Sequence, residues 1–117
     1  MRILCGFLFL SFLSLTTNLH AAEARCTGQV LEVGAHQPDL LVLRLNGSSF
    51  LVVCSFTSTG KFNRVTPELC KSFSSIAAQA LATGGNLLLV IDNAPSTDCS
   101  ALTNFSQQDV RYLSLIN

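Results

Sequence analysis

The chain has 117 residues, in which seven lysines and arginines face seven aspartates and glutamates and charged residues make up only 12% of the total. This length suffices for one small domain. The neutral balance excludes the class of proteins that bind nucleic acid through charge, because they need a basic surplus to displace the counterions of the phosphates.

The N-terminal segment has the pattern of a secretory signal peptide. One positive charge at Arg2 precedes an apolar run from Ile3 to Leu15, and small residues follow it. The run is shorter than the roughly 20 residues that span a bilayer, and no other segment is a candidate span. We therefore predict a signal peptide over residues 1–22, with cleavage after Ala22 or Ala24. The domain over residues 23–117 is then secreted or periplasmic.

Five later segments have strand patterns. They are residues 27–34, 39–45, 48–55, 86–92 and 109–116. Residues 86–92 are almost continuously apolar, as expected for a strand buried on both faces. Asn46-Gly47 indicates a two-residue hairpin turn, and the register that follows places Leu43, Phe50 and Cys54 on one face, the predicted core face.

Residues 66–85 are the only segment after the signal that predicts a helix. Thr66 can cap its start, Pro67 suits the first helical position, and Gly84 can end it in a left-handed conformation. The predicted apolar face of the helix consists of Leu69, Phe73, Ile76, Ala77 and Ala80.

The element order predicts the fold class. Three strands, a helix and two strands are the order of the OB-fold, a mainly β, five-stranded Greek-key barrel with one helix between strands 3 and 4. Closure of the barrel removes the exposed edges of a small sheet, and the helix covers one end. An open sheet that carries one helix is the alternative.

The cysteine pattern favours two disulfides. An even number of cysteines in an exported chain indicates a disulfide framework, and here the cysteines after the signal are Cys26, Cys54, Cys70 and Cys99. Metal binding would need closer spacings and more than the single histidine His36. We expect Cys54 to pair with Cys70, between the third strand and the helix. We expect Cys26 to pair with Cys99, because the first and fourth strands of an OB-fold run antiparallel.

No residue set for catalysis is evident. His36 lies in a turn, and Asp92 and Asp98 flank turn signals, where aspartate bonds its own backbone. We expect no catalytic residue, no metal site and no cofactor, so the protein is not an enzyme. Four aromatic side chains outside the predicted core can stack on a ligand, although each alone more often packs against its own loop: Phe56, Phe62, Phe105 and Tyr112.

Short motifs spread over most of the domain carry a resemblance to a known family. They are Thr27-Gly28, Val53-Cys54-Ser55, Ser72-Phe73, Gln79-Ala80, Thr83-Gly84 and the last strand at 110–115. With these motifs the chain resembles the OB-fold binding (B) subunits of A-B toxins of the subtilase cytotoxin and pertussis-like type. Small exported bacterial proteins of the same pattern are similar to an equal degree.

The resemblance implies a homo-pentamer that binds sialylated glycans on host glycoproteins and joins a toxin A subunit. It places Thr27 where the family has a serine in its glycan pocket, so the hydroxyl is retained. It places Ile91 where the family has a tyrosine.

We therefore expect an exported, non-enzymatic binding protein, glycan-directed in the manner of a toxin B subunit, with Thr27 at the glycan site. The alternative is a stand-alone periplasmic protein that binds or inhibits another protein and has no sugar site.

Overall fold

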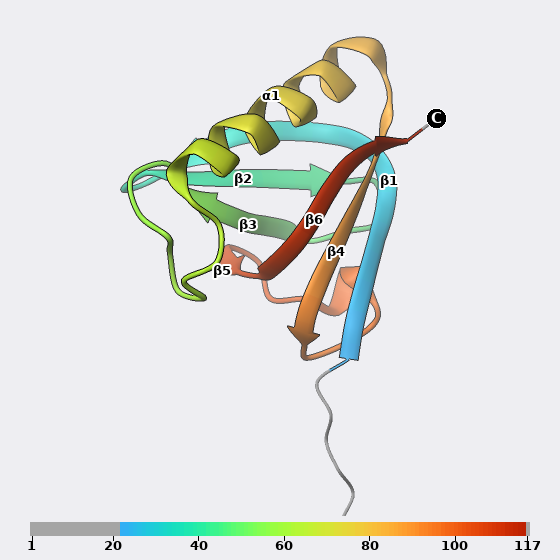
Figure 1. The fold of residues 1–117 in the computed structure, drawn as a ribbon. Coiled ribbons are helices and arrows are strands. Elements are labelled where there is room, and N and C mark those ends of the chain that lie inside the picture. The colour runs from blue at the N-terminus through green and yellow to red at the C-terminus, as the bar shows by residue number, and fades with distance from the viewer. Residues whose placement is uncertain (1–21, 117) are drawn as a thin grey trace, which may run out of the picture.

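The computed structural model describes residues 22–116, so all of the predicted signal peptide except Ala22 lies outside the described residues. Six strands form one mixed sheet that curls into a half-barrel, and one helix lies over it (Figure 1). The elements are β1 (Ala22–His36), β2 (Leu40–Leu45), β3 (Phe50–Ser55), α1 (Pro67–Thr83), β4 (Asn86–Ala94), the 3-10 helix η1 (Cys99–Ala101), β5 (Ser106–Gln107) and β6 (Asp109–Ile116). None of the described helices is long and apolar enough to cross a membrane.

The long strand β1 belongs to both halves of the sheet. Residues 22–29 pair with β4 and residues 30–36 pair with β2, both antiparallel, in the strand order β5-β3-β2-β1-β4-β6. All five predicted strands are present, and β1 extends beyond the predicted range at both ends. The sixth strand, β5, arises because Ser106 and Gln107 pair in parallel with β3 before the chain continues as β6.

Helix α1 begins and ends where the sequence predicts. The Thr66 side chain accepts a hydrogen bond from the Leu69 amide at 3.2 Å, and Gly84 adopts φ of 68°. The buried face differs in one position. Leu69 was predicted to face the core but is 41% exposed, whereas Cys70 is fully buried, because its disulfide holds that side of the first turn against β3.

The predicted register of the β2–β3 hairpin is wrong by one residue. The Leu45 amide donates to the Ser48 hydroxyl at 2.9 Å instead of to a backbone carbonyl, so the turn is longer than Asn46-Gly47. Strand pairing resumes at Arg44 opposite Phe50. The shift turns Phe50 to the outer face of the sheet. A register shift between Leu41 and Val42 returns Cys54 to the core.

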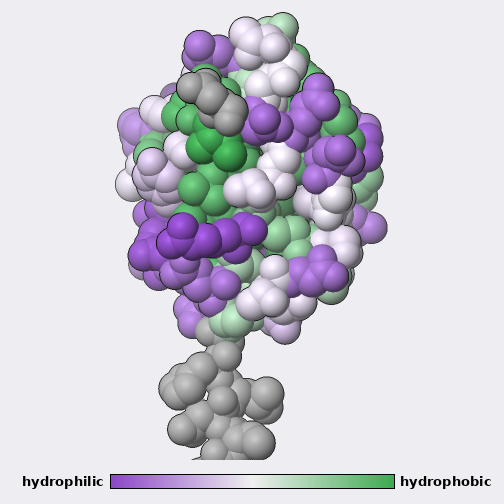
Figure 2. All heavy atoms as spheres, turned by 90° about the vertical axis from the view of Figure 1, so that its right-hand side faces the viewer, coloured by the Kyte–Doolittle hydropathy of each residue, from purple (hydrophilic) through white to green (hydrophobic). Residues whose placement is uncertain are grey.

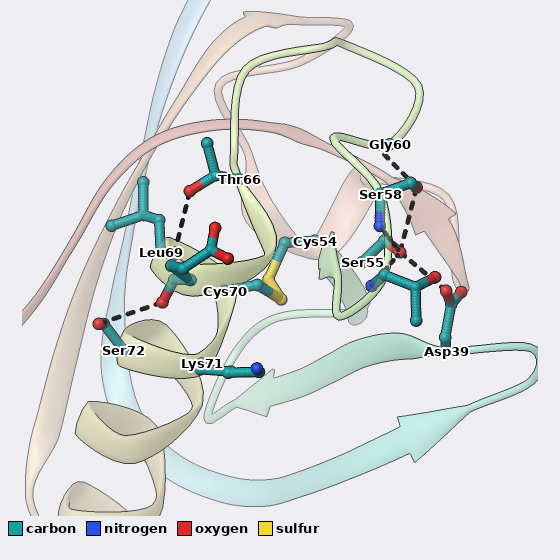
Figure 3. The surroundings of a disulfide bond; sticks show 12 residues. Asp39, Cys54, Ser55, Ser58, Gly60, Thr66, Leu69, Cys70, Lys71 and Ser72 are labelled. Carbon is teal, nitrogen blue, oxygen red and sulfur yellow. Dashed lines mark hydrogen bonds between the residues drawn. A yellow bond between two sulfur atoms is a disulfide. The ribbon is translucent and has the colours of Figure 1, made fainter.

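Two disulfides join distant parts of the chain, and both are the pairs that the sequence predicts. Cys54 of β3 is bonded to Cys70 of α1, close to the Thr66 cap (Figure 3). Cys26 of β1 is bonded to Cys99 of η1. Because disulfides form and persist in oxidising compartments, both bonds are compatible with a secreted protein.

The core lies between the curled sheet and α1. Its largest fully buried side chains are Leu41, Leu43, Leu45, Leu51, Leu87, Leu89 and Ile91. The prediction that residues 86–92 are buried on both faces holds only in part, because Leu88 on the outer face is half-buried. That outer face carries the candidate site.

Candidate ligand-binding face

The strands β1, β4 and β6 present an outer face that we call the β4 face. Strand register aligns Arg25 with Val90 and Tyr112, and Thr27 with Leu88 and Ser114. Side chains alternate along a strand, so these residues share the side turned away from the core. Figure 2 looks at this side of the molecule and shows an apolar patch bordered by hydrophilic side chains.

The β4 face contains a shallow hollow with an apolar floor. The hollow encloses about 300 Å³ and is lined by Leu88, Val90, Arg25, Arg111 and Tyr112. Val90 is only 5% exposed, whereas the Tyr112 ring is 52% exposed. A ligand in the hollow would therefore meet an apolar floor, an open aromatic ring and a border of ion-paired arginines.

A β-bulge places two exposed side chains on this face together. Val90 pairs with Tyr112 but Ile91 pairs with Val110, so Arg111 is the extra residue in β6. A bulge lets two consecutive side chains turn to one face of a sheet. Arg111 and Tyr112 are both exposed beside β4 for this reason.

The charges at the border of the β4 face are linked through Glu23. Its carboxylate accepts from Arg25 Nε at 2.9 Å and from Arg111 Nη2 at 2.8 Å, and Arg111 also lies 3.3 Å from Asp92. A guanidinium has five N–H donors, and Arg25 uses one of them on Glu23. Because 67% of the Arg25 side chain is exposed, its remaining donors can bind an acidic group of a ligand.

Thr27 lies on the same face, exposed, with Leu88 as its strand partner. The adjacent Gly28 turns toward the hairpin, where a Cβ would approach the Asn46 carbonyl oxygen to 2.7 Å. Only glycine permits this close approach of two backbones. The Thr27-Gly28 motif therefore combines an outward hydroxyl with a close contact on the inner side.

The family's tyrosine position does not reach this face. Ile91, which occupies it, is fully buried in the core. The exposed ring comes instead from Tyr112 in the neighbouring strand. In the sequence, Tyr112 is only one of four aromatic residues outside the predicted core. Period-two alternation could have grouped Arg25 with Thr27, but the register that adds Tyr112 has no local sequence signal.

The other aromatic candidates lie elsewhere. Phe105 stacks on Phe50 and approaches His36 at the opposite half of the sheet, with ring centroids 4.9 Å and 5.2 Å apart. Phe56 packs against the core. Lys61 lies over the Phe62 ring at 5.4 Å.

Any assignment of a function to this chain depends on its fold and on the two faces of its sheet. No protein-family model matches the sequence, and neither a curated protein nor a solved structure is significantly similar to it.

Proposed function

We propose that this chain is an exported, non-enzymatic glycan-binding protein of OB-fold type, and that its β4 face binds the glycan. One observation carries the proposal: the Thr27 hydroxyl, the Tyr112 ring and the Arg25 guanidinium share one exposed face over the apolar side chains of β4. A sugar offers an apolar ring face for stacking and hydroxyls for hydrogen bonds. The β4 face offers partners for both.

The path of the chain from β3 to β6 supports the barrel. β5 pairs in parallel with β3, and after Gln108 the same segment continues as β6 beside β4. Residues 106–116 thus reach from one end of the strand order to the other. That linkage is what an OB-fold barrel requires of its last strand, with β5 and β6 as two parts of it.

The size of the face suits a glycan of one or two rings. Neighbouring strands lie about 4.8 Å apart, and Tyr112 is aligned with Arg25, two residues along β1 from Thr27, so Thr27 and Tyr112 are roughly 12 Å apart across β4. The exposed donors of Arg25 favour a glycan with a carboxylate. This preference agrees with the sialylated glycans that the toxin resemblance implies.

A glycan array probed with the purified chain tests the proposal. We expect binding to acidic glycans, and about a tenfold or greater loss with Thr27→Ala, because an unpaired polar partner at a binding site costs about 1 to 3 kcal/mol. Tyr112→Ala should lose binding more severely than Tyr112→Phe, which keeps the ring. Thr57→Ala, an exposed threonine in the loop after β3, is the matched control and should bind as the original chain does.

Two results would contradict the proposal. One is an array with no bound glycan, and the other is equal binding by the original chain and Thr27→Ala. The native mass of the purified chain separates the two hypotheses drawn from the sequence. A ring fits a toxin-type B subunit with an A-subunit partner, and a monomer fits a stand-alone protein that binds another protein.

A further inference from the structure

The second half of β1 has an edge that no other strand covers. Residues 30–36 pair with β2 on one side, whereas β4 accompanies β1 only as far as Gln29. The Val30 amide still donates to the Gly85 carbonyl, at 3.2 Å. Beyond it, within the described residues, no strand pairs with the side of β1 that faces away from β2.

A hollow of about 520 Å³ runs along this edge. Its lining includes six consecutive residues of β1, from Leu31 to His36. Alternate side chains of a strand point to opposite faces, so a hollow over one face would touch only every second residue. Contact with six in a row means that the hollow reaches the backbone groups of β1, and the presence of Val42 and Phe50 in its lining means that it also extends over the outer face of β2 and β3.

Both flanks of the edge are apolar. On the helix side, Leu31 and Leu81 are 37% and 42% exposed. On the outer side, Phe105 is 50% exposed and stacked on Phe50, and Gly34 leaves open space, since a Cβ built there meets nothing within 4 Å. A strand placed along the edge would direct its alternate side chains onto these two flanks.

The usual protection of a free edge is weak here. Native edges carry charges, prolines or bulges that prevent strand addition. A register shift at Leu31 and the proline at position 38 limit the open stretch to about five residues, roughly 16 Å of strand. Its one charged side chain, Glu32, is bonded to Arg44 at 2.8 Å on the outer face. The hollow is therefore neutral and favours an uncharged, apolar occupant.

We propose that the β1 edge at residues 32–36 binds an extended apolar peptide of another protein as an added strand. Backbone groups of β1 give the hydrogen bonds, and the two flanks select alternating apolar side chains, as in other cases of strand addition. His36 Nδ1 lies 2.9 Å from the Gln37 carbonyl, which leaves Nε2 to meet a polar group of the peptide.

The size of the hollow favours a peptide over a second folded copy. Ten residues line it, whereas a stable dimer uses about 20 to 30 residues on each partner. A volume of about 520 Å³ lies within the range of about 300 to 1,000 Å³ for pockets that enclose small ligands. A segment of four or five residues matches both the length and the volume.

Selection from a random seven-residue peptide display library on the purified chain tests this inference. We expect enriched peptides with alternating apolar residues, and at least a tenfold loss of their affinity in Gly34→Trp, which fills the hollow, and in Leu81→Asp, which charges one flank. Leu69→Asp is the matched control, because Leu69 is an equally exposed leucine of α1 and lies outside the hollow. Amide hydrogen exchange should slow within residues 31–36 when peptide binds.

Three results would overturn the inference. They are no enrichment over an unrelated protein, binding that Gly34→Trp leaves intact, and a concentration-dependent dimer that Gly34→Trp abolishes, which would assign the edge to a second copy. Thermal unfolding of each variant verifies that it is folded. Peptide binding should survive Thr27→Ala, and glycan binding should survive Gly34→Trp, so failure of one proposal leaves the other testable.

Discussion

Ala24 shows how the start of the domain is fixed at the level of single residues. Its methyl group is fully buried in β1 opposite Ile91, and the neighbouring Glu23 bonds to Arg25 and Arg111. Residues 22–24 are therefore part of the folded body. Of the two cleavage sites that the sequence permits, the cut after Ala22 preserves these contacts except the pairing of Ala22 itself.

A chain that begins at Arg25 should be less stable than one that begins at Glu23. It loses a buried methyl group, strand pairing with β4 and two ion pairs, which together amount to about 2 kcal/mol. For a domain of this size we expect a decrease in Tm of about 10 °C. Circular dichroism melting of the two chains measures it.

Glu23→Gln in the chain that begins at residue 23 removes the two ion pairs but keeps the backbone pairing. We expect it to lower Tm by less than half of the decrease caused by beginning the chain at Arg25. Equal melting temperatures for the two starting points would show that residues 23 and 24 add nothing to the stability of the fold.

The intact mass of the exported protein should correspond to cleavage after Ala22.

At the scale of elements, local chemistry predicts helix α1 well and the hairpin less well. Thr66, Pro67 and Gly84 act through contacts within one turn, so the sequence alone locates both helix ends. The hairpin register depends on whether the Leu45 amide donates its hydrogen bond to the Ser48 hydroxyl or to the Ser48 carbonyl. The Asn46-Gly47 motif does not indicate which of the two accepts it.

The difference between local contacts and strand pairing also decides how much of the candidate site could be predicted. Thr27 was predicted from the family resemblance, and Tyr112 joins it only through the pairing of β1, β4 and β6. The bulge at Arg111 and the one-residue shift that turns Phe50 to the outer face are properties of paired strands. No single segment contains the information that determines them.

The two disulfides should differ in their contribution to stability. In the chain-entropy model, removing Cys54–Cys70, with a separation of 16 residues, costs about 3 kcal/mol. Removing Cys26–Cys99, with a separation of 73 residues, costs about 4 kcal/mol. Urea unfolding of the two Cys→Ala double variants compares them, and a larger loss for Cys54–Cys70 would contradict the ordering.

On the scale of the whole molecule, ion pairs join segments that are distant in the sequence. Arg64, in the loop before α1, bonds to Asp92 of β4 and lies 3.3 Å from Asp109 of β6. The hydrogen bond to Asp92 raises the pKa of Arg64. Asp109 is only 7% exposed, so it depends on this guanidinium more than a surface carboxylate would.

Arg64→Gln should destabilise the domain more than the loss of a surface ion pair does, because it leaves the Asp109 carboxylate buried beside a neutral partner. Arg25→Gln is the control for a surface ion pair and should cost less than about 1 kcal/mol. Denaturant unfolding measures both variants. Equal small losses would mean that water replaces Arg64 at no cost.

The nested order of the disulfides has a consequence for how the protein matures. Of the four cysteines in these two bonds, Cys26 comes first in the sequence and Cys99 last, while Cys54 and Cys70 lie between them. In a chain that crosses a membrane N-terminus first, Cys26 and Cys54 have both emerged before Cys70 and Cys99, their native partners, appear. An oxidant that joins cysteines as they appear makes the wrong pair, and only attack by another thiolate can release it. If the chain is exported as its sequence predicts, its maturation depends either on delayed oxidation or on a thiol that exchanges the first bond formed.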